Sequence, residues 1–464
     1  MRALLPTQRR RGRLSRWFLD FPARASVLGF AVLILIGTGL LMLPAASTGA
    51  SLHAVDALFT ATSAACVTGL VVLDTGSDFT VLGQAVILLL IQTGGLGIMT
   101  ISILFLMVAG GRPGLMERAL IHQSFSYQTR LSPVEILRNV VLLTLGFETA
   151  GALLLWPVFL GDFPPGEAFY QAGFHAVSAF CNAGFSLFSD SLSGYRGHPL
   201  MNLVVCGLIV SGGLGFLVLL EGGRALRRKR RRWERLSLHA KMALATTGLL
   251  LAGSVLLVLA LEWNHTLAGL SWPDKLMAAV FQAATPRTAG FNTVDIGRLA
   301  NETLFLFVLL MFVGGSPGSC AGGIKTTTLA CLGFLGLSRL RGHQRPRLFR
   351  RTLPEGAVWR SLQVGLTSGL VVAAGLMLLL ITERGDLPVA ESRAQFPELL
   401  FEVVSAFGTV GLSTGATPHL SVSGKLVITA LMFIGRLGPL VLGMAISRHA
   451  APRAAYAEEN VMIG

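Results

Sequence analysis

The stretch ATSAACVTGLVVLDT, residues 61–75, is a short apolar hairpin centred on Gly69. A phenylalanine and a serine precede this glycine, with spacings of four and then six residues. The pattern returns three more times, and the third of the four copies is one residue shorter. The four copies are Phe59, Ser63 and Gly69; Phe174, Ser178 and Gly184; Phe281, Thr285 and Gly290; and Phe401, Ser405 and Gly411. Four copies at roughly even spacing indicate an internal fourfold repeat, which decides the fold.

A second glycine motif follows each hairpin. The sequences TGGLG, SGGLG, VGGSPG and IGRLG begin at Thr93, Ser211, Val313 and Ile434. Their first glycines follow the four hairpin glycines by 25, 28, 24 and 24 residues. Because two linked motifs recur together four times, chance is a poor explanation and the repeat is a property of the fold.

The composition is that of a membrane protein. Of the 464 residues, 52% are hydrophobic and only 13% are charged, whereas soluble domains carry about 25% charged residues. A membrane-spanning helix needs about 20 apolar residues. The sequence offers eight such runs: 23–44, 80–109, 136–160, 199–220, 240–261, 302–334, 357–381 and 422–447. We therefore predict eight spans, with one hairpin inside each consecutive pair.

The net charge of +14 does not indicate a nucleic-acid partner, because its arginines cluster between repeat units and at the termini. The acidic residues lie mostly on the hairpin side. By the positive-inside rule, both termini and the inter-unit loops are predicted to be cytoplasmic. We expect a multi-pass protein of the cell inner (plasma) membrane. Its basic run at 224–235 is expected to contact anionic lipids.

The repeat divides the chain into four predicted units. They are residues 1–110 with a basic N-terminal arm, 111–222, 223–338 with a broken inner helix, and 339–464 with a short cytosolic tail. Each unit reads as outer helix, short helix, re-entrant loop and inner helix. The predicted fold class is all-α integral membrane. It has eight transmembrane helices and four re-entrant short helices in a pseudo-fourfold arrangement around one pore.

Non-helical backbone at membrane depth is tolerated only where it is buried or lines a water-filled path. Four such loops around one axis would form a ring of carbonyl oxygens. Carbonyl rings replace the hydration shell of an alkali cation in potassium-channel filters, whose signature begins Thr-Val-Gly. The fourth hairpin carries Thr409, Val410 and Gly411 in that order. The sequence therefore favours cation conduction through the hairpins.

At these residues the chain resembles the Trk/Ktr/HKT superfamily of potassium transporters. The resemblance rests on the hairpins CVTGL, CNAGF, RTAGF and GTVGL, the broken helix GGSPGSCAGGIKTTT and the arginine in IGRLGP. It covers about residues 20–449, and the short N-terminus is more like the KtrB branch than the longer TrkH branch. The resemblance implies potassium uptake and no enzymatic reaction. It also implies a homodimer with one pore per subunit, a cytosolic nucleotide-binding ring as regulatory partner, and stimulation by Na⁺.

The resemblance also assigns site residues, with K⁺ held by backbone carbonyls and no cofactor bound. The implied selectivity filter comprises Cys66, Val67, Thr68, Gly69, Cys181, Asn182, Ala183, Gly184, Arg287, Thr288, Ala289, Gly290, Gly408, Thr409, Val410 and Gly411. The implied gate comprises Gly314, Gly315, Ser316, Pro317, Gly318, Gly322, Gly323 and Lys325. The implied pore barrier is Arg436.

The sequence leaves more than one role open for several charged residues. Arg436 is either a barrier facing the pore or the partner of Glu148, since a charge inside an apolar helix is costly unless it is paired or functional. Lys325 is either part of the gate or a snorkelling side chain. Arg287 is expected to point away from the pore and to pair with an acid. Four carboxylates could concentrate cations at the entrance: Asp74, Asp78, Asp295 and Glu402.

Other function classes remain as alternatives. A sodium-permeable or cation/H⁺-coupled member of the same superfamily is the nearest one. In that superfamily a serine at the first filter glycine is associated with sodium permeation, and this chain has glycine at all four positions. A secondary solute transporter would require repeats of alternating orientation, but every basic loop here lies on one side. The five cysteines show no metal-ligand spacing, and the scattered histidines argue against a membrane enzyme.

Overall fold

The protein is described by a computed structural model over residues 22–49, 52–96, 133–226, 233–234, 236–342, 347–349, 351–385, 388 and 393–446. Helices dominate these residues, so the prediction of a helical protein is confirmed. The strands in this part of the chain are β1 (Arg347–Leu348) and β2 (Arg351–Thr352), which pair antiparallel. The predicted N-terminal arm, C-terminal tail and most of the basic run lie outside the described residues.

The helices of the first two units follow the predicted order. The first unit contains α2 (Pro22–Leu41), η1 (Pro44–Ala46), α3 (Ala54–Ala65) and α4 (Val81–Gly95). The second contains α7 (Pro133–Phe159), α8 (Pro165–Cys181), η2 (Ser193–Tyr195), α9 (Pro199–Leu214) and α10 (Phe216–Leu226). In each unit a long outer helix and an inner helix flank one short helix, α3 or α8.

The third and fourth units repeat this order. The third contains α11 (Leu238–Glu262), α12 (Trp272–Ala284), η3 (Ile296–Arg298), α13 (Asn301–Phe312) and α14 (Thr326–Leu340). The fourth contains α15 (Glu355–Glu383), α17 (Phe396–Gly408), η4 (Thr417–His419), α18 (Val422–Leu437) and α19 (Pro439–Ile446). The short helices here are α12 and α17, and β1 and β2 connect the two units.

Local sequence explains where many of these helices begin. Side-chain oxygens cap the inner helices α4 and α18, where Thr80 accepts from the Gly83 N–H at 3.3 Å and Ser421 from the Gly424 N–H at 3.0 Å. Such caps satisfy N–H groups that have no partner inside the helix. A proline occupies one of the first two positions of α8, α12 and α17, where its fixed φ suits the first turn.

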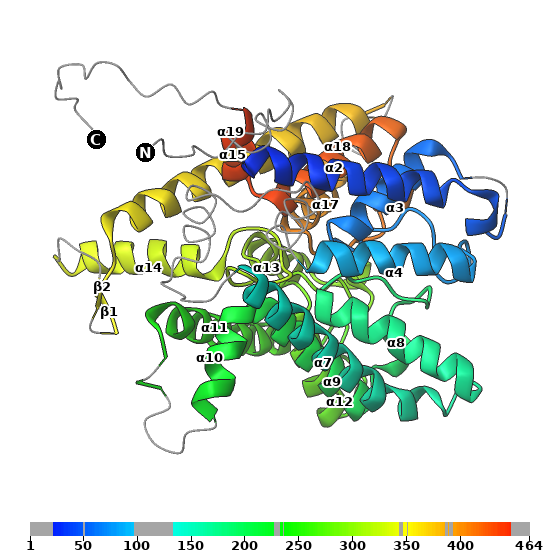
Figure 1. Cartoon of the computed structure of the whole chain (residues 1–464), viewed down its shortest axis with the longest axis horizontal. Helices are drawn as coiled ribbons and strands as arrows, with labels where there is room; N and C mark the ends of the chain where they lie inside the picture. The colour runs from blue at the N-terminus through cyan, green and yellow to red at the C-terminus, as the bar shows by residue number, and fades with distance from the viewer. Residues whose placement is uncertain are drawn as a thin grey trace, which may run out of the picture.

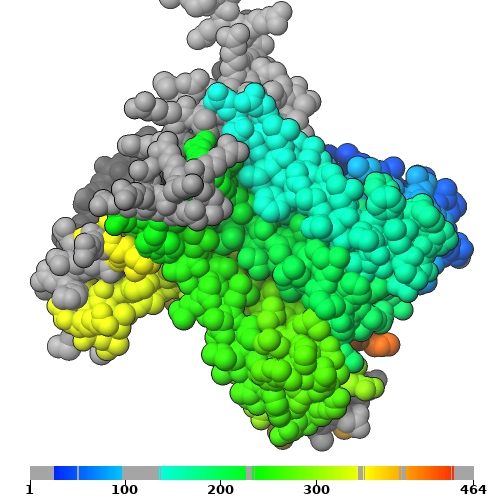
Figure 2. Space-filling view, turned by 90° about the horizontal axis from the view of Figure 1, so that it is seen from below, coloured from blue at the N-terminus to red at the C-terminus, as the bar shows by residue number. Residues whose placement is uncertain are grey.

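The units contact one another in a cycle. The inner helix of each unit packs against the short helix of the next: α4 against α8, α9 against α12, and α13 against α17. The cycle closes because α18 of the fourth unit packs against α3 of the first. Figure 1 shows the first and fourth units together on one side of the molecule, and Figure 2 shows cyan and green residues of the second and third units covering the opposite side.

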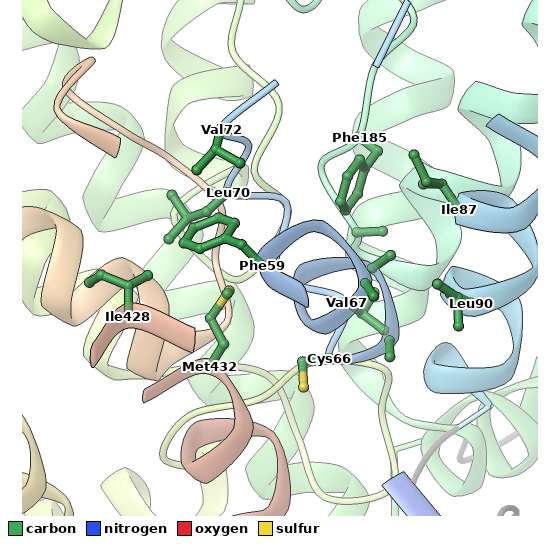
Figure 3. Packing of buried hydrophobic residues seen from close by; sticks show 14 of the residues in the cluster. Phe59, Cys66, Val67, Leu70, Val72, Ile87, Leu90, Phe185, Ile428 and Met432 are labelled. Atoms are coloured by element: carbon green, nitrogen blue, oxygen red, sulfur yellow. The ribbon is translucent and has the colours of Figure 1, made fainter. Parts of the chain in front are cut away.

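The repeated phenylalanines lie in the core of this arrangement. Phe59, Phe174, Phe281 and Phe401 are each at most 1% exposed. In the first unit, Phe59 projects from α3 towards Met432 and Ile428 of α18, while Ile87 and Leu90 of α4 lie on the other side of the short helix (Figure 3). The phenylalanine of the repeat therefore anchors each short helix between its neighbours.

The outer helices carry apolar side chains on their exposed faces. Three described helices are long and apolar enough to cross a membrane alone: Leu137–Phe159, Leu238–Glu262 and Glu355–Glu383. Leu249 and Leu256 on α11 are 75% and 68% exposed, and Leu370 on α15 is 70% exposed, as expected of helices surrounded by lipid. The bent pair α9 and α10 would make a fourth span, and three shorter apolar helices occur. The count of eight spans stays a prediction.

Some of the predicted spans are not single helices. The run 199–220 is bent by 106° between α9 and α10, at Gly215, whose φ is 88°. The run 422–447 is likewise interrupted at Gly438, with a φ of 82°. Both glycines end a second glycine motif, and glycine reaches positive φ without a Cβ clash. The prediction of continuous helices was wrong there, whereas the predicted break in the third inner helix is present between α13 and α14.

Candidate functional site

All four hairpins have the same backbone conformation. Two residues before each hairpin glycine, a residue with a side chain adopts positive φ: Val67 (56°), Asn182 (59°), Thr288 (72°) and Thr409 (52°). These are four of the six described non-glycine residues with positive φ. The β-branched residues among them are strained in this region, and such strain concentrates at functional sites. The hairpin glycines follow with φ between 71° and 93°.

The serine or threonine of the repeat braces each hairpin. In the first and fourth copies its hydroxyl accepts from the glycine N–H, with Ser63 3.1 Å from Gly69 N and Ser405 3.2 Å from Gly411 N. In the other two copies the hydroxyl donates to the carbonyl after the glycine, from Ser178 to Phe185 at 2.7 Å and from Thr285 to Phe291. The repeat spacing thus fixes the loop to the end of its own short helix.

The four hairpin glycines meet in a closed ring. A Cβ placed on Gly184 would lie 2.8 Å from the Cα of Gly290, and one on Gly411 would lie 2.9 Å from the Cα of Gly69. A Cβ on Gly290 would likewise lie close to the Cα of Gly411, and one on Gly69 close to the Cα of Gly184. Carbonyl oxygens of the preceding residues lie between the glycines: Thr68, Ala183, Ala289 and Val410. No side chain fits there, so glycine Cα atoms and backbone oxygens make the contacts that close this glycine ring.

A pocket of about 160 Å³ lies on one side of the glycine ring. All four hairpin glycines line it, together with residues that follow them in the sequence. Its polar side chains belong to Asp74, Thr75, Ser186, Ser189, Ser191, Asn292 and Ser413. Asp74 is the carboxylate among the lining residues, and this outer pocket is otherwise lined by hydroxyl, amide and apolar groups. It is a chamber of mixed polar and apolar lining that borders the glycine ring.

The second glycine motif brings the inner helices close to the short helices. A Cβ at Gly94 would collide with the carbonyl oxygen of Ala65, and one at Gly435 with that of Phe407. Gly212 is held in the same way against the carbonyl of Phe180. These glycines therefore permit a backbone approach that any larger residue would prevent. The two motifs recur together because they form one packing unit.

The loop between α13 and α14, residues 313–325, contacts hairpin residues before the glycines, whereas the outer pocket is lined by the glycines and residues after them. A Cβ at Gly322 would collide with the side chain of Thr409, and one at Gly314 would lie 3.3 Å from Thr288 Cγ2. Both contacted residues precede their hairpin glycines. The loop is also tied to the second unit, because the N–H of Ser316 donates to the carbonyl of Gly213 at 2.8 Å.

Two basic side chains hold the 313–325 loop. Lys325 Nζ donates to the carbonyl of Ala321 at 2.6 Å, and Arg436 donates to the adjacent carbonyl of Cys320. Arg436 also donates to the carbonyl of Gly94, so it links the third and first units. It is 5% exposed, and its Nε has no partner among the described residues. The buried charge of Arg436 and the half-buried charge of Lys325 therefore both lie beside the loop.

The alternative prediction, an ion pair between Arg436 and Glu148, is wrong for the described residues. Glu148 accepts instead from Gln92 Nε2 at 3.2 Å and contacts Cys181 Sγ at 3.7 Å. Arg287 does point away from the glycine ring, as expected. Among the described residues its hydrogen-bond partner is the hydroxyl of Thr247 on α11, at 3.2 Å, rather than a carboxylate. The arginine of the third hairpin thus anchors it to the outer helix of its own unit.

The four carboxylates predicted at the entrance are not equivalent. Asp74 lines the outer pocket, and Asp78 lies beside it, accepting from the Asp74 N–H at 2.8 Å. Asp295 forms an exposed ion pair with Arg298 at 3.2 Å. Glu402 is fully buried and accepts hydrogen bonds from its own hairpin. The expectation that Glu402 faces entering cations was therefore wrong.

Two features of the hairpins were not predicted from the sequence. The repeated hydroxyl residues were given no role, although their spacing is visible in the repeat: Ser63, Ser178, Thr285 and Ser405. Positive φ two residues before each glycine was not predicted either, since valine and threonine rarely adopt that conformation. The structure brings the four hairpin glycines together, places the predicted filter residue Arg287 against α11, and sets Gly314 and Gly322 of the predicted gate against Thr288 and Thr409.

Lipid-facing helices that enclose a pocket ending in a ring of backbone carbonyls define a membrane transport protein for cations. The chain belongs to the TrkH family of cation transport proteins, whose family model matches residues 21–456. The predicted resemblance to the superfamily is thereby confirmed, as is the prediction of a transport protein that is not an enzyme.

Individual relatives extend over nearly the whole chain. Ktr system potassium uptake protein B of Bacillus subtilis is 40% identical over 97% of this chain and 98% of its own length. Potassium/sodium uptake protein NtpJ of Enterococcus hirae is 37% identical over 96% of this chain and 97% of its own length. The crystal structure of the potassium transporter TrkH from Vibrio parahaemolyticus matches with a TM-score of 0.72 at 19% identity, over 95% of this chain and 87% of that one, and supports the fold.

Proposed function

We propose that this chain is the ion-conducting membrane subunit of a potassium uptake system. The observation that carries the proposal is the closed ring of Gly69, Gly184, Gly290 and Gly411, with carbonyl oxygens between the glycines. Such a ring can replace the water around a K⁺ ion without supplying a charge that would trap it. Two relatives whose names specify potassium uptake, at 40% and 37% identity over nearly the full chain, support the same substrate.

In this proposal the ion follows a path with three stages. K⁺ enters the outer pocket, where Asp74 raises the local cation concentration. It exchanges its water for carbonyl oxygens of the filter residues at the glycine ring. It then passes the 313–325 loop and Arg436 to reach the cytoplasm. The membrane potential drives the step and supplies about 2.3 kcal/mol per charge for each 100 mV.

The 313–325 loop acts as the gate in this proposal. It contacts hairpin residues before the ring glycines and packs against Thr409 through Gly322. Its residues Gly314, Gly315, Ser316, Pro317, Gly318, Gly322, Gly323 and Lys325 are the proposed moving part. Since Lys325 and Arg436 hold two adjacent loop carbonyls, shifting these two contacts would free the loop. Arg436 would also limit cation flux by electrostatic repulsion.

The proposed preference for K⁺ over Na⁺ follows from the glycine ring. Glycine at all four positions leaves the carbonyl ring unobstructed, which favours the larger, more weakly hydrated K⁺. A relative named a potassium/sodium uptake protein supports a role for Na⁺ as stimulator or second substrate. A sodium-permeable or cation/H⁺-coupled transporter is therefore the alternative within the family. A secondary solute transporter is less well supported, because successive units contact one another in a single cyclic sense.

The proposed assembly follows the family resemblance and the wording of relatives that belong to a "Ktr system". We propose a homodimer with one pore per subunit, bound to a cytosolic nucleotide-binding ring. The four units, 1–110, 111–222, 223–338 and 339–464, would surround the pore with pseudo-fourfold symmetry. The protein would reside in the inner membrane, with both termini in the cytoplasm and anionic lipids along the basic loops.

Uptake of ⁸⁶Rb⁺ and ²²Na⁺ into proteoliposomes tests the proposed function. A negative-inside potential should drive ⁸⁶Rb⁺ uptake that excess K⁺ suppresses, and excess Na⁺ should suppress it less. Imposing a pH gradient without a potential separates H⁺ coupling from electrical driving. Equal competition by K⁺ and Na⁺ would favour the sodium-permeable alternative. No flux of either ion under any gradient would reject the proposal.

A further inference from the structure

The residue directly after the repeated phenylalanine differs in each unit. It is Thr60, His175, Gln282 or Glu402, and all four side chains are at most 1% exposed. A polar side chain buried at an equivalent position in four copies must find partners or remain costly. In the second and fourth units the partner is the chain just outside the hairpin glycine.

Glu402 binds the outer end of the fourth hairpin. One of its oxygens accepts from the Ser413 hydroxyl at 2.6 Å and from the Thr414 N–H at 3.0 Å. The other oxygen accepts from the hydroxyl of Thr417. Ser413 lies two residues after the ring glycine Gly411 and lines the outer pocket. Glu402 therefore fixes a pocket residue without facing the pocket.

His175 has the corresponding place in the second hairpin. Its Nδ1 lies 2.8 Å from the carbonyl of Gln171, so this nitrogen carries the proton. Its Nε2 then accepts from the Leu187 N–H at 3.4 Å and lies 3.1 Å from the hydroxyl of Ser186. The imidazole is stacked on Phe188, with ring centroids 5.0 Å apart. Ser186 and Phe188 both line the outer pocket.

The other two units lack this contact. Within the described residues, the Thr60 hydroxyl and both polar atoms of the Gln282 amide have no hydrogen-bond partner. At this position a side chain thus binds the chain outside the glycine in two of the four hairpins, the second and the fourth. In the cycle of contacts these two hairpins alternate with the two that lack this additional bond.

We propose that Glu402 and His175 are positioning residues that set the outer opening of the filter through hydrogen-bond geometry. The inference rests on the proposed function, since it concerns the same ring of carbonyls. It assigns no role to the negative charge of Glu402, because that carboxylate is covered by its own hairpin. Ion preference then depends on how firmly Ser413 and Ser186 are held beside the ring glycines.

Two substitutions of Glu402 separate geometry from charge. In Glu402→Gln the amide oxygen can accept from Ser413 and Thr414 while the amide nitrogen donates to Thr417, so the bracing remains without the charge. In Glu402→Leu, a side chain of similar size, all of these bonds are lost. We expect the preference for Rb⁺ over Na⁺ to stay within about twofold of wild type in Glu402→Gln and to fall about tenfold or more in Glu402→Leu.

Glu383 supplies the matched control. It is a carboxylate of the same unit that accepts from the N–H and hydroxyl of Ser421, at the start of α18. Among the described residues, none of its hydrogen bonds reaches the hairpin. We expect Glu383→Leu to leave the ratio of Rb⁺ to Na⁺ uptake unchanged. A fall in that ratio would show that any disturbed carboxylate of this unit has the same effect, which would overturn the inference.

The experiment measures competing uptake of ⁸⁶Rb⁺ and ²²Na⁺ by equal amounts of folded protein in proteoliposomes. An equal fall in the preference for Rb⁺ over Na⁺ in Glu402→Gln and Glu402→Leu would mean that the charge of Glu402 sets the preference. A wild-type preference in Glu402→Leu would mean that neither its charge nor its hydrogen bonds set it. Either result overturns the inference. If Glu402→Leu does not fold, Ser413→Ala replaces it. We expect this variant to show a smaller fall in the preference for Rb⁺ over Na⁺. An unchanged ratio of Rb⁺ to Na⁺ uptake would overturn the inference. Loss of flux in wild type would instead reject the proposed function, and the inference with it.

Discussion

Lys425 Nζ lies 2.7 Å from Asp56 Oδ1, and this ion pair joins the inner helix of the fourth unit to the short helix of the first. The two residues are 369 positions apart in the sequence. Their side chains are only 16% and 19% exposed. The contact closes the cycle in which each inner helix packs against the next short helix. It therefore connects the first and fourth units through the first turns of α3 and α18.

Breaking this pair should loosen the closure of the cycle. We expect Lys425→Ala to lower the stability of the protein by about 1 to 3 kcal/mol, between the values for exposed and buried ion pairs. Thermal unfolding in detergent measures the effect. The exchanged pair Asp56→Lys with Lys425→Asp should recover part of the loss, whereas additive losses in that double variant would mean that the two side chains do not interact.

The close approach of inner and short helices leads to a second prediction. A methyl group at Gly212 would collide with the Phe180 carbonyl, so we expect Gly212→Ala to destabilise the protein by about 2 kcal/mol. Gly207 lies on the same helix, and a methyl group there would have no neighbouring atom within 4 Å. Gly207→Ala should raise stability by about 0.5 to 1 kcal/mol, because alanine is the better helix former.

The melting temperatures of the two variants, measured side by side, give the comparison. A lower value for Gly212→Ala and an equal or higher value for Gly207→Ala would support the packing role of the second motif. Equal stability of the two variants would contradict it, and would leave the repeated spacing of that motif without a structural reason.

Much of this architecture is predictable from the sequence. The repeat of phenylalanine, hydroxyl residue and glycine predicts four similar hairpins, and the second motif places glycine on three inner helices, α4, α9 and α18, and in the loop after α13. Composition alone indicates a membrane protein. The break between α13 and α14 also follows from sequence, because GGSPGSCAGG contains too many glycines for a continuous helix.

Removal of the buried positive charge gives a third prediction. We expect Arg436→Gln to raise the rate of ⁸⁶Rb⁺ uptake at least about threefold, because a single charge close to the path raises the barrier for a cation by more than about 1 kcal/mol. Glutamine can still donate one hydrogen bond to the Cys320 carbonyl and so retains part of the loop contact. An unchanged or lower rate at equal protein content would assign Arg436 a purely structural role.

The contact between the 313–325 loop and the fourth hairpin can be altered by one methyl group. At Gly322 that group would collide with the Thr409 side chain, so Gly322→Ala should displace the loop and change ⁸⁶Rb⁺ uptake by about threefold or more. Gly333→Ala, on α14 and without neighbours within 4 Å, is the control and should behave as wild type. Wild-type uptake in Gly322→Ala would argue against a gate at this position.

Other features could not be predicted, for identifiable reasons. The bend at Gly215 was missed because the short SGGLG motif within an apolar run does not by itself specify a break. Glu402 was expected at the entrance because its sequence position is close to the fourth hairpin glycine, yet the donors that bury it come from residues 11 to 15 positions further on. The partners of Arg436 are carbonyls of two other units, and no sequence pattern marks a backbone oxygen as an acceptor.

The most direct test of the glycine ring compares Gly290→Ser with Gly269→Ser. Both glycines belong to the third unit and have nearly the same φ, 79° and 78°, so both serines impose similar backbone strain. A Cβ at Gly290 would lie 2.9 Å from the Cα of Gly184, whereas one at Gly269 has no neighbour within 4 Å.

The measurement is competing ⁸⁶Rb⁺ and ²²Na⁺ uptake into proteoliposomes at a negative-inside potential. If the four glycines form the filter, Gly290→Ser loses Rb⁺ uptake or exchanges it for Na⁺ uptake, while Gly269→Ser keeps the wild-type preference. If both variants retain the wild-type preference for Rb⁺, the glycine ring does not select the ion, and the hairpins are structural turns.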